Sequence, residues 1–201
     1  MLNTFGAWGT HIPESSLETT IDYVVTGSTI NTVEPSLDII SNIQCDKENC
    51  TILDFGSGIG RNCIYLAINN PNYTVYAYDN PKMLNKMKEF GIAKYKTNIF
   101  DIPNLKTVSE WDNLKNHQFD YIYATLVFQH INESSLDIYL QDIKKMTNNL
   151  IIFGRRANDH SSNNTWQILE KHYLLPLNIE SYKTHGDPED HQLAIYNLKG
   201  V

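Results

Sequence analysis

The sequence predicts an α/β fold in which a mostly parallel sheet carries helices on both faces. Three observations predict it. Short β-branched or aromatic runs alternate with amphipathic stretches from residue 51 onward. A glycine-rich turn directly follows the first of these runs. The last two runs lie too close together for a crossover helix, so we expect them to form an antiparallel pair.

Composition limits the class of protein further. The chain has 201 residues, of which 41% are hydrophobic and 19% charged, which favours one globular domain. No apolar run reaches the ~20 residues of a membrane span, and the N-terminus lacks a signal-peptide pattern, so we expect a cytoplasmic protein. A formal charge of −7 argues against nucleic-acid binding and favours a small-molecule or protein substrate. We expect the three cysteines to be reduced and expect no metal site.

Residues 1–45 are predicted to form an N-terminal helical cap, and residues 46–201 the core of one compact domain. Ser15 and Glu18 have capping-box spacing, and an apolar stripe ends near Gly27, which suits a helix C-cap. The stripe consists of Leu17, Ile21, Val24 and Val25. A second helix is expected to begin at Pro35.

The first half of the core is predicted as two strand–helix units and a weak third strand. Strands are expected at 51–53 and 74–78, with a helix to about residue 68 between them. Asn80 is expected to cap the next helix, with Pro81 at its first position and Gly91 at its end. The weak strand is expected at 93–97.

The second half of the core is predicted to continue the alternation of strands and helices. A buried strand is expected at 119–125, a helix over 136–143 and a strand at 150–153. A helix over 166–173 is then followed by the antiparallel pair, at 178–183 and 192–196.

The turn after the first strand carries the strongest functional signal. Gly56, Gly58 and Gly60 directly follow a strand and open a helix. Glycine allows a ligand to touch the backbone and permits positive φ. The second strand ends in Asp79, where an acidic side chain can accept hydrogen bonds from ribose hydroxyls, so a nucleoside-containing ligand is indicated. The alternative is a tight connection with solvated carboxylates.

Spacing decides between nucleoside ligands. A dinucleotide fingerprint requires G-x-G-x-x-G with a pyrophosphate at the helix N-terminus, whereas this chain has G-x-G-x-G two residues after Asp54. That carboxylate would repel a pyrophosphate but attract an ammonium and a sulfonium. The pattern therefore disfavours a dehydrogenase.

The segment ILDFGSGIGRN closely resembles motif I of the class I S-adenosylmethionine-dependent methyltransferases, and the resemblance runs from about Pro35 to the C-terminus. It implies a Rossmann-like doubly wound sheet of seven strands with an antiparallel last strand. It also implies S-adenosylmethionine as cofactor and S-adenosylhomocysteine as product. The residues that it assigns to the cofactor are Asp54, Gly56, Ser57, Gly58, Gly60, Asp79 and the neighbouring Asn80.

Further positions follow from the same resemblance. Asp101 and Ile102, in the segment NIFDI, would meet the adenine, although an Asp before Ile-Pro can equally be a loop cap. Thr125 and Leu126 would lie near the cofactor, and Gln129 near the entry to the substrate cleft.

Methyl transfer from a sulfonium is an in-line displacement that depends mainly on positioning. His130 is the candidate general base, with packing against the sheet as the alternative role. Candidate substrate contacts are Trp8 and Tyr23, which could instead be core residues, and Arg155 and Arg156, which could instead be solvated charges.

These patterns predict an enzyme that transfers a methyl group to an oxygen or nitrogen of a small-molecule acceptor. Protein or nucleic-acid methylation is the alternative, although ATLVFQHI lacks the Asn/Asp-Pro-Pro-aromatic motif of enzymes that methylate bases. A non-catalytic nucleoside-binding subunit of the same fold is a third reading. No membrane partner is expected.

Overall fold

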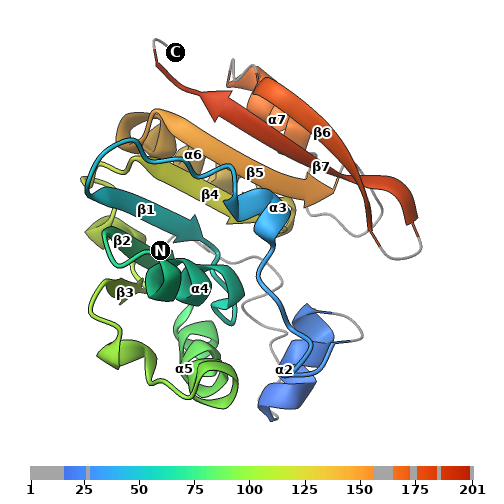
Figure 1. Ribbon diagram of the computed structural model, residues 1–201. Coiled ribbons are helices and arrows are strands. Elements are labelled where there is room, and N and C mark those ends of the chain that lie inside the picture. The colour runs from blue at the N-terminus through green and yellow to red at the C-terminus, as the bar shows by residue number, and fades with distance from the viewer. Residues whose placement is uncertain (1–15, 26–27, 156–164, 173–175, 185–186, 200–201) are drawn as a thin grey trace.

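A computed structural model describes residues 16–25, 28–155, 165–172, 176–184 and 187–199 (Figure 1). Its centre is a seven-stranded sheet in the order β3-β2-β1-β4-β5-β7-β6. The strands are β1 (Cys50–Phe55), β2 (Tyr73–Tyr78), β3 (Leu105–Val108), β4 (Tyr121–Thr125), β5 (Asn149–Arg155), β6 (Pro176–Thr184) and β7 (Asp187–Asn197). Strands β1 to β5 run parallel, and β7 pairs antiparallel with both β5 and β6. The predicted sheet with its antiparallel last strand is confirmed.

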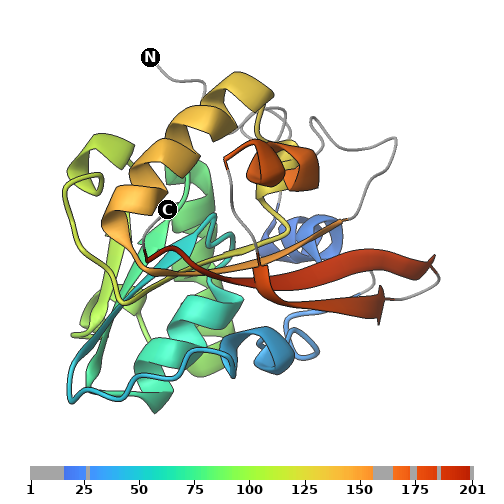
Figure 2. The same cartoon turned by 90° about the horizontal axis from the view of Figure 1, so that it is seen from above.

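Alternation along the buried strands divides the core into two layers. In β1, Cys50 and Ile52 join one apolar cluster, while Leu53 and Phe55 join the other. The first cluster contains residues of α4 (Arg61–Asn69) and α5 (Pro81–Tyr95), and the second contains residues of α6 (Glu133–Met146) and α7 (Thr165–Lys171). Figure 2 shows α6 and α7 on one side of the sheet and α4 on the other.

Asparagine side chains set the start of two of these helices. The Asn80 side chain accepts a hydrogen bond from the Met83 amide at 2.9 Å, and Pro81 occupies the first helical position, as the sequence predicts. Asn132 caps α6 in the same way through the Ser135 amide, at 2.9 Å. Since Asn80 directly follows Asp79, this cap fixes the chain at the end of β2.

The N-terminal helices pack on the same core layer as α4 and α5. Helix α2 (Leu17–Val24) is capped by Ser16, one residue after the predicted Ser15, and its Ile21 is fully buried. Helix α3 (Leu37–Ile40) is a single turn, and the Ser36 amide before it donates to Asn62 of α4 at 2.8 Å. Gly27, the predicted C-cap, lies outside the described residues.

The predicted third strand is wrong. Helix α5 does not end at Gly91 but continues to Tyr95, so residues 93–95 are helical, and β3 instead begins at Leu105. Gly91 allows close packing: a Cβ there would lie 2.7 Å from the Cγ2 of Ile99 and 3.1 Å from the Thr97 carbonyl oxygen. Lys96, which caps the end of the helix, has a φ of 57°.

The cysteine prediction is also corrected. Cys45 and Cys50 form a disulfide with a Cα–Cα distance of 6.1 Å, whereas Cys63 of α4 is free and buried. The loop before β1 brings Cys45 back beside the first residue of the strand, and a sequence pattern alone does not define that loop. Among the described residues, none of the helices is long and apolar enough to cross a bilayer.

Candidate functional site

The glycine turn lies at the carboxyl ends of β1 and β2. The Gly56 and Ser57 amides both donate to the Tyr78 carbonyl, at 2.8 and 3.0 Å, and the Gly60 amide donates back to the Ser57 carbonyl at 2.9 Å. Below the turn, the ring of Phe55 packs against four aromatic rings with centroid distances of 5.0–5.4 Å, those of Tyr78, Trp111, Phe128 and Tyr139. The turn therefore rests on a packed aromatic base.

The glycines of the turn serve different purposes, although all three have positive φ, at 74°, 57° and 85°. A Cβ on Gly56 would lie 2.4 Å from the Cγ2 of Val127, and one on Gly60 would lie 2.5 Å from the Cγ of Met87. A Cβ on Gly58 would meet only the Cε of Met83, at 3.9 Å. Gly56 and Gly60 thus permit close packing, while Gly58 leaves its backbone open to a ligand.

Asp79, directly after β2, binds the backbone of this turn through its carboxylate. One carboxylate oxygen accepts from the Gly58 amide at 2.7 Å, and the other accepts from the Asn80 amide at 2.7 Å. Burial raises the pKa of Asp79 to about 6, although both backbone hydrogen bonds act in the opposite direction. The turn and the end of β2 therefore hold a buried carboxylate that is mostly ionised at neutral pH.

Asp54, the penultimate residue of β1, is buried beside the turn. Burial raises its pKa to about 7, and the negative charge of Asp79 adds to the rise. The Tyr123 hydroxyl and the Arg61 guanidinium act in the opposite direction. Two acidic groups with raised pKa values therefore flank the glycine turn, an arrangement typical of functional sites.

Two buried hydroxyl groups of this region have no hydrogen-bond partner among the described residues. They belong to Ser57 in the turn and to Thr125, the last residue of β4. The Tyr123 hydroxyl, in the middle of β4, lies beside the Asp54 carboxylate. Buried polar groups are normally paired, so an orphaned group indicates a missing ligand or water.

Leu126, directly after β4, has a φ of 57° and donates from its amide to the Phe153 carbonyl at 2.7 Å. Backbone strain in a non-glycine residue is typical of ligand sites.

Gln129 and His130 lie on the 3₁₀ turn η3 (Phe128–His130), which follows β4. Gln129 is buried, and its Nε2 lies 3.4 Å from the Nε2 of His130. A Cβ on Gly154 of β5 would approach the Oε1 of Gln129 to 3.4 Å and the ring of Trp166 to 3.7 Å. The segment after β4 thus packs against the end of β5, which Trp166 of α7 also approaches.

Other residues singled out in the sequence lie elsewhere. Asp101 and Ile102 precede β3 rather than follow it, so they lie at the amino edge of the sheet, away from Asp79. The family resemblance assigns these two residues to the adenine, and their position before β3 does not support that assignment. Tyr23 is 49% exposed on α2, which packs on α5. Trp8 and Arg156 lie outside the described residues, as does the side chain of Arg155.

Sequence reasoning missed the segment that does follow β3. The Asp79 amide donates to the Val108 carbonyl at 3.3 Å, so Ser109 and Glu110 begin beside the acidic end of β2. Trp111 then anchors the segment, because its Nε1 donates to Asp142 of α6 at 2.9 Å. The sequence signal for β3 is the short run LKTV between Pro103 and Trp111, which is a weaker strand pattern than those of the other strands.

The order of the sheet, its reversed strand β7 and the glycine turn beside two buried carboxylates define the fold of the class I S-adenosylmethionine-dependent methyltransferases. A crystal structure of TehB from Haemophilus influenzae superposes with a TM-score of 0.59 at 19% identity, covering 90% of this chain and 67% of that one. A methyltransferase from Aquifex aeolicus gives 0.61 at 17% identity, covering 90% and 98%.

The family model described as tellurite resistance protein TehB matches residues 20–168, and the chain belongs to this family. A relative in Haemophilus influenzae, described as a probable S-adenosyl-L-methionine-dependent methyltransferase TehB, is 30% identical over 118 residues. That match covers 55% of this chain and 38% of the relative. The chain thus matches well under half the length of this curated relative.

Proposed function

We propose that this chain binds S-adenosylmethionine at the glycine turn and transfers its methyl group to a small-molecule acceptor. The observation that carries the proposal is the pair of buried carboxylates, Asp54 and Asp79, on either side of a turn whose Gly58 backbone is open. Two acidic groups and an exposed backbone suit a ligand that combines cationic groups with a ribose. They do not suit a pyrophosphate.

The residues around the turn fit the parts of this cofactor. Asp79 would accept hydrogen bonds from the ribose hydroxyls, while Asn80 holds it in place by donating backbone and side-chain hydrogen bonds at 2.7 and 3.1 Å. Asp54 would attract the ammonium group. The unpaired hydroxyls of Ser57 and Thr125, with the neighbouring Leu126, would complete the methionine end.

We assign the adenine to the segment after β3 in place of Asp101. Ser109 and Glu110 follow the strand that pairs with β2, and so reach the same edge of the sheet as Asp79. Their position is fixed by the Trp111–Asp142 hydrogen bond. A carboxylate here can accept from the adenine amino group.

When bound, S-adenosylmethionine supplies a methyl group on a positively charged sulfur, ready for displacement by a nucleophile. The chain itself would position the two reactants. The glycine turn would hold the cofactor, and the segment after β4 would hold the acceptor. His130 would accept a proton from an acceptor hydroxyl or ammonium, and Gln129, buried beside it, would orient the imidazole.

The acceptor is proposed as a small molecule because the chain has a net charge of −7, which is unfavourable for a nucleic-acid backbone. The same proposal keeps residues 1–45 as a helical cap on the core at 46–201, and Tyr23 and Trp8 as substrate contacts. Arg155 and Arg156, at the carboxyl end of β5, would receive an anionic group of the acceptor.

The test is turnover with methyl-labelled S-adenosylmethionine and a panel of small phenols, carboxylic acids and amines. We expect S-adenosylhomocysteine to form in an acceptor-dependent way. The His130→Gln variant should bind S-adenosylhomocysteine as the wild type does but turn over about 100-fold more slowly, as expected for loss of a general base. Cofactor binding without turnover on any small molecule, protein or RNA would favour a non-catalytic subunit instead.

A further inference from the structure

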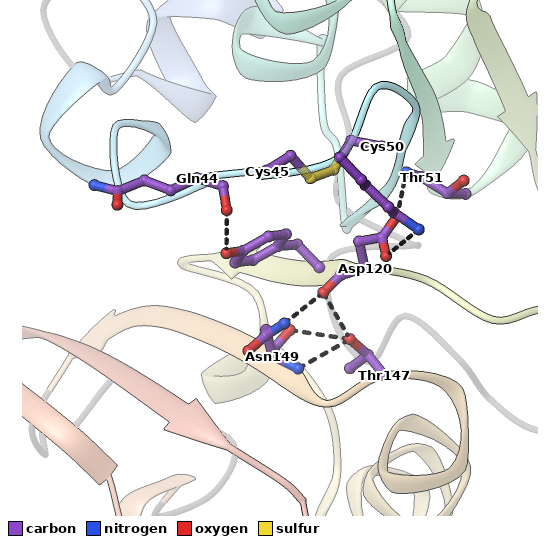
Figure 3. Close-up of polar contacts among 9 residues, drawn as sticks. Gln44, Cys45, Cys50, Thr51, Asp120, Thr147 and Asn149 are labelled. Atoms are coloured by element: carbon purple, nitrogen blue, oxygen red, sulfur yellow. Dashed lines mark hydrogen bonds and ion pairs between the residues drawn. A yellow bond between two sulfur atoms is a disulfide. The ribbon is translucent and has the colours of Figure 1, made fainter.

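The disulfide and Asp120 lie together at the amino ends of β1 and β4 (Figure 3). The glycine turn follows the other end of β1, at the opposite edge of the sheet. Cys50 is the first residue of β1, and Asp120 directly precedes β4. The six residues of β1 span roughly 17 Å, so this cluster is separate from the proposed cofactor site.

The cluster contains three groups that can bind a metal ion. The sulfur atoms of Cys45 and Cys50 and a carboxylate oxygen of Asp120 all lie within 4.8 Å of one another. Such a spread is small enough for one cation to reach all three, because zinc–sulfur bonds measure about 2.3 Å and zinc–oxygen bonds about 2.0–2.2 Å. The sequence does not predict this site because its third ligand is 70 residues away from Cys50.

Asp120 is held rigidly in this position. Its carboxylate accepts from the Thr51 amide at 2.8 Å, and its amide donates to the Thr51 carbonyl at 2.7 Å. Its own carbonyl accepts from the side chains of Asn149, at 2.9 Å, and Thr147, at 3.3 Å. These contacts orient the carboxylate toward the cysteines, as outer-shell partners orient metal ligands.

The loop around the cysteines is anchored as well. The Tyr121 hydroxyl donates to the Gln44 carbonyl at 2.7 Å, which holds the residue before Cys45 against β4. Lys47, within the loop, forms an ion pair with Asp120 at 2.6 Å. Since the Lys47 side chain is 59% exposed, it can leave for solvent and release the second carboxylate oxygen.

We propose that this cluster is a redox-gated site for a thiophilic divalent cation such as Zn²⁺. A dithiol reductant transfers two electrons and two protons to the disulfide, giving two cysteine thiols and the oxidised reductant. The cation then displaces both thiol protons and the Lys47 ammonium, and it binds two thiolates and the Asp120 carboxylate. Water takes the fourth position. In the disulfide form neither sulfur can become a thiolate, so the site is closed.

The test is cadmium titration of the full chain, followed by the ultraviolet charge-transfer absorption of cadmium–thiolate bonds. Reduced protein, freed of reductant under anaerobic conditions, is expected to bind one Cd²⁺, for which a large excess of Zn²⁺ competes. Protein in the disulfide form is expected to give no such absorption. A Cys63→Ala variant serves as the matched control and should titrate as the wild type does, because Cys63 is buried in α4, away from the cluster.

Two variants test the ligands one by one. Asp120→Asn keeps an acceptor for the Thr51 amide but removes the charge, and it should weaken cadmium binding at least about tenfold. Cys45→Ser leaves one thiol and should abolish stoichiometric binding. The proposal is overturned if reduced wild type gives no cadmium–thiolate absorption, if Asp120→Asn binds as tightly as wild type, or if the disulfide form binds equally well.

Discussion

Acidification from pH 8 to pH 6 is expected to weaken cofactor binding, because Asp54 must be ionised to attract the ammonium group and Asp79 must be ionised to accept both ribose hydrogen bonds. Burial raises the pKa of Asp54 to about 7 and that of Asp79 to about 6. The apparent dissociation constant rises as the fraction of competent protein falls. From pH 8 to pH 6 the ionised fraction of Asp54 falls about tenfold and that of Asp79 about twofold, so the combined loss is about 20-fold.

The assay is calorimetric titration with S-adenosylhomocysteine at pH 6, 7 and 8, for wild type and Asp54→Asn. The variant binds more weakly at pH 8, and its remaining pH dependence should be only the roughly twofold effect of Asp79. The ligand's own amino group titrates equally in both proteins, so the ratio of their dissociation constants isolates Asp54. If that ratio is the same at pH 6 and pH 8, Asp54 does not control binding.

The same pKa shifts give a stability effect of opposite sign. In the absence of ligand, folded protein holds protons on Asp54 and Asp79 that the unfolded chain, with carboxyl pKa values near 3.8, has released. Stability therefore falls as the pH rises from about 4 to about 7, since the folded state binds more protons in this window. Asp54→Asn should flatten this part of the stability profile.

Two further predictions concern the turn and the disulfide. Gly56→Ala and Gly58→Ala should each strain the backbone by about 1–2 kcal/mol, because both glycines have a left-handed φ. Only Gly56→Ala adds a clash with Val127, so its free energy of unfolding in urea should fall by about 1–3 kcal/mol more than that of Gly58→Ala. Equal losses of stability in the two variants would contradict the packing role of Gly56. Without reductant, Cys45→Ser should have a free energy of unfolding about 2 kcal/mol below that of the wild type, and equal to that of the reduced wild type. If the variant and the wild type are equally stable under non-reducing conditions, the disulfide does not constrain the unfolded chain.

The sequence predicts those parts of the fold that depend on local chemistry. Asn80 with Pro81 predicts a helix start because the cap and the fixed φ of proline act within four residues. The closeness of the last two strands predicts their antiparallel pairing for a similarly local reason. Gly56, Gly58 and Asp79 were identified together because a strand end, a turn and an acidic residue have a regular spacing in such sheets.

Prediction from the sequence fails where tertiary contacts override the local conformational preference of a residue. Gly91 resembles a helix end, yet its missing Cβ serves close packing against Ile99, and the helix continues. This error placed the third strand before residues 98–102 instead of after them. The Cys45–Cys50 disulfide was missed because the path of the loop before β1 brings Cys45 back beside the strand. Its neighbour Asp120 was missed because the pairing of β1 with β4 brings it there.

The most direct measurement is calorimetric titration of S-adenosylhomocysteine into the wild type and into Asp79→Ala, with a nicotinamide dinucleotide as the competing ligand. We expect one S-adenosylhomocysteine per chain, and at least about 100-fold weaker binding in the variant, because two charge-assisted hydrogen bonds to the ribose are lost. A wild-type protein that binds the dinucleotide and not S-adenosylhomocysteine would contradict the proposed cofactor site.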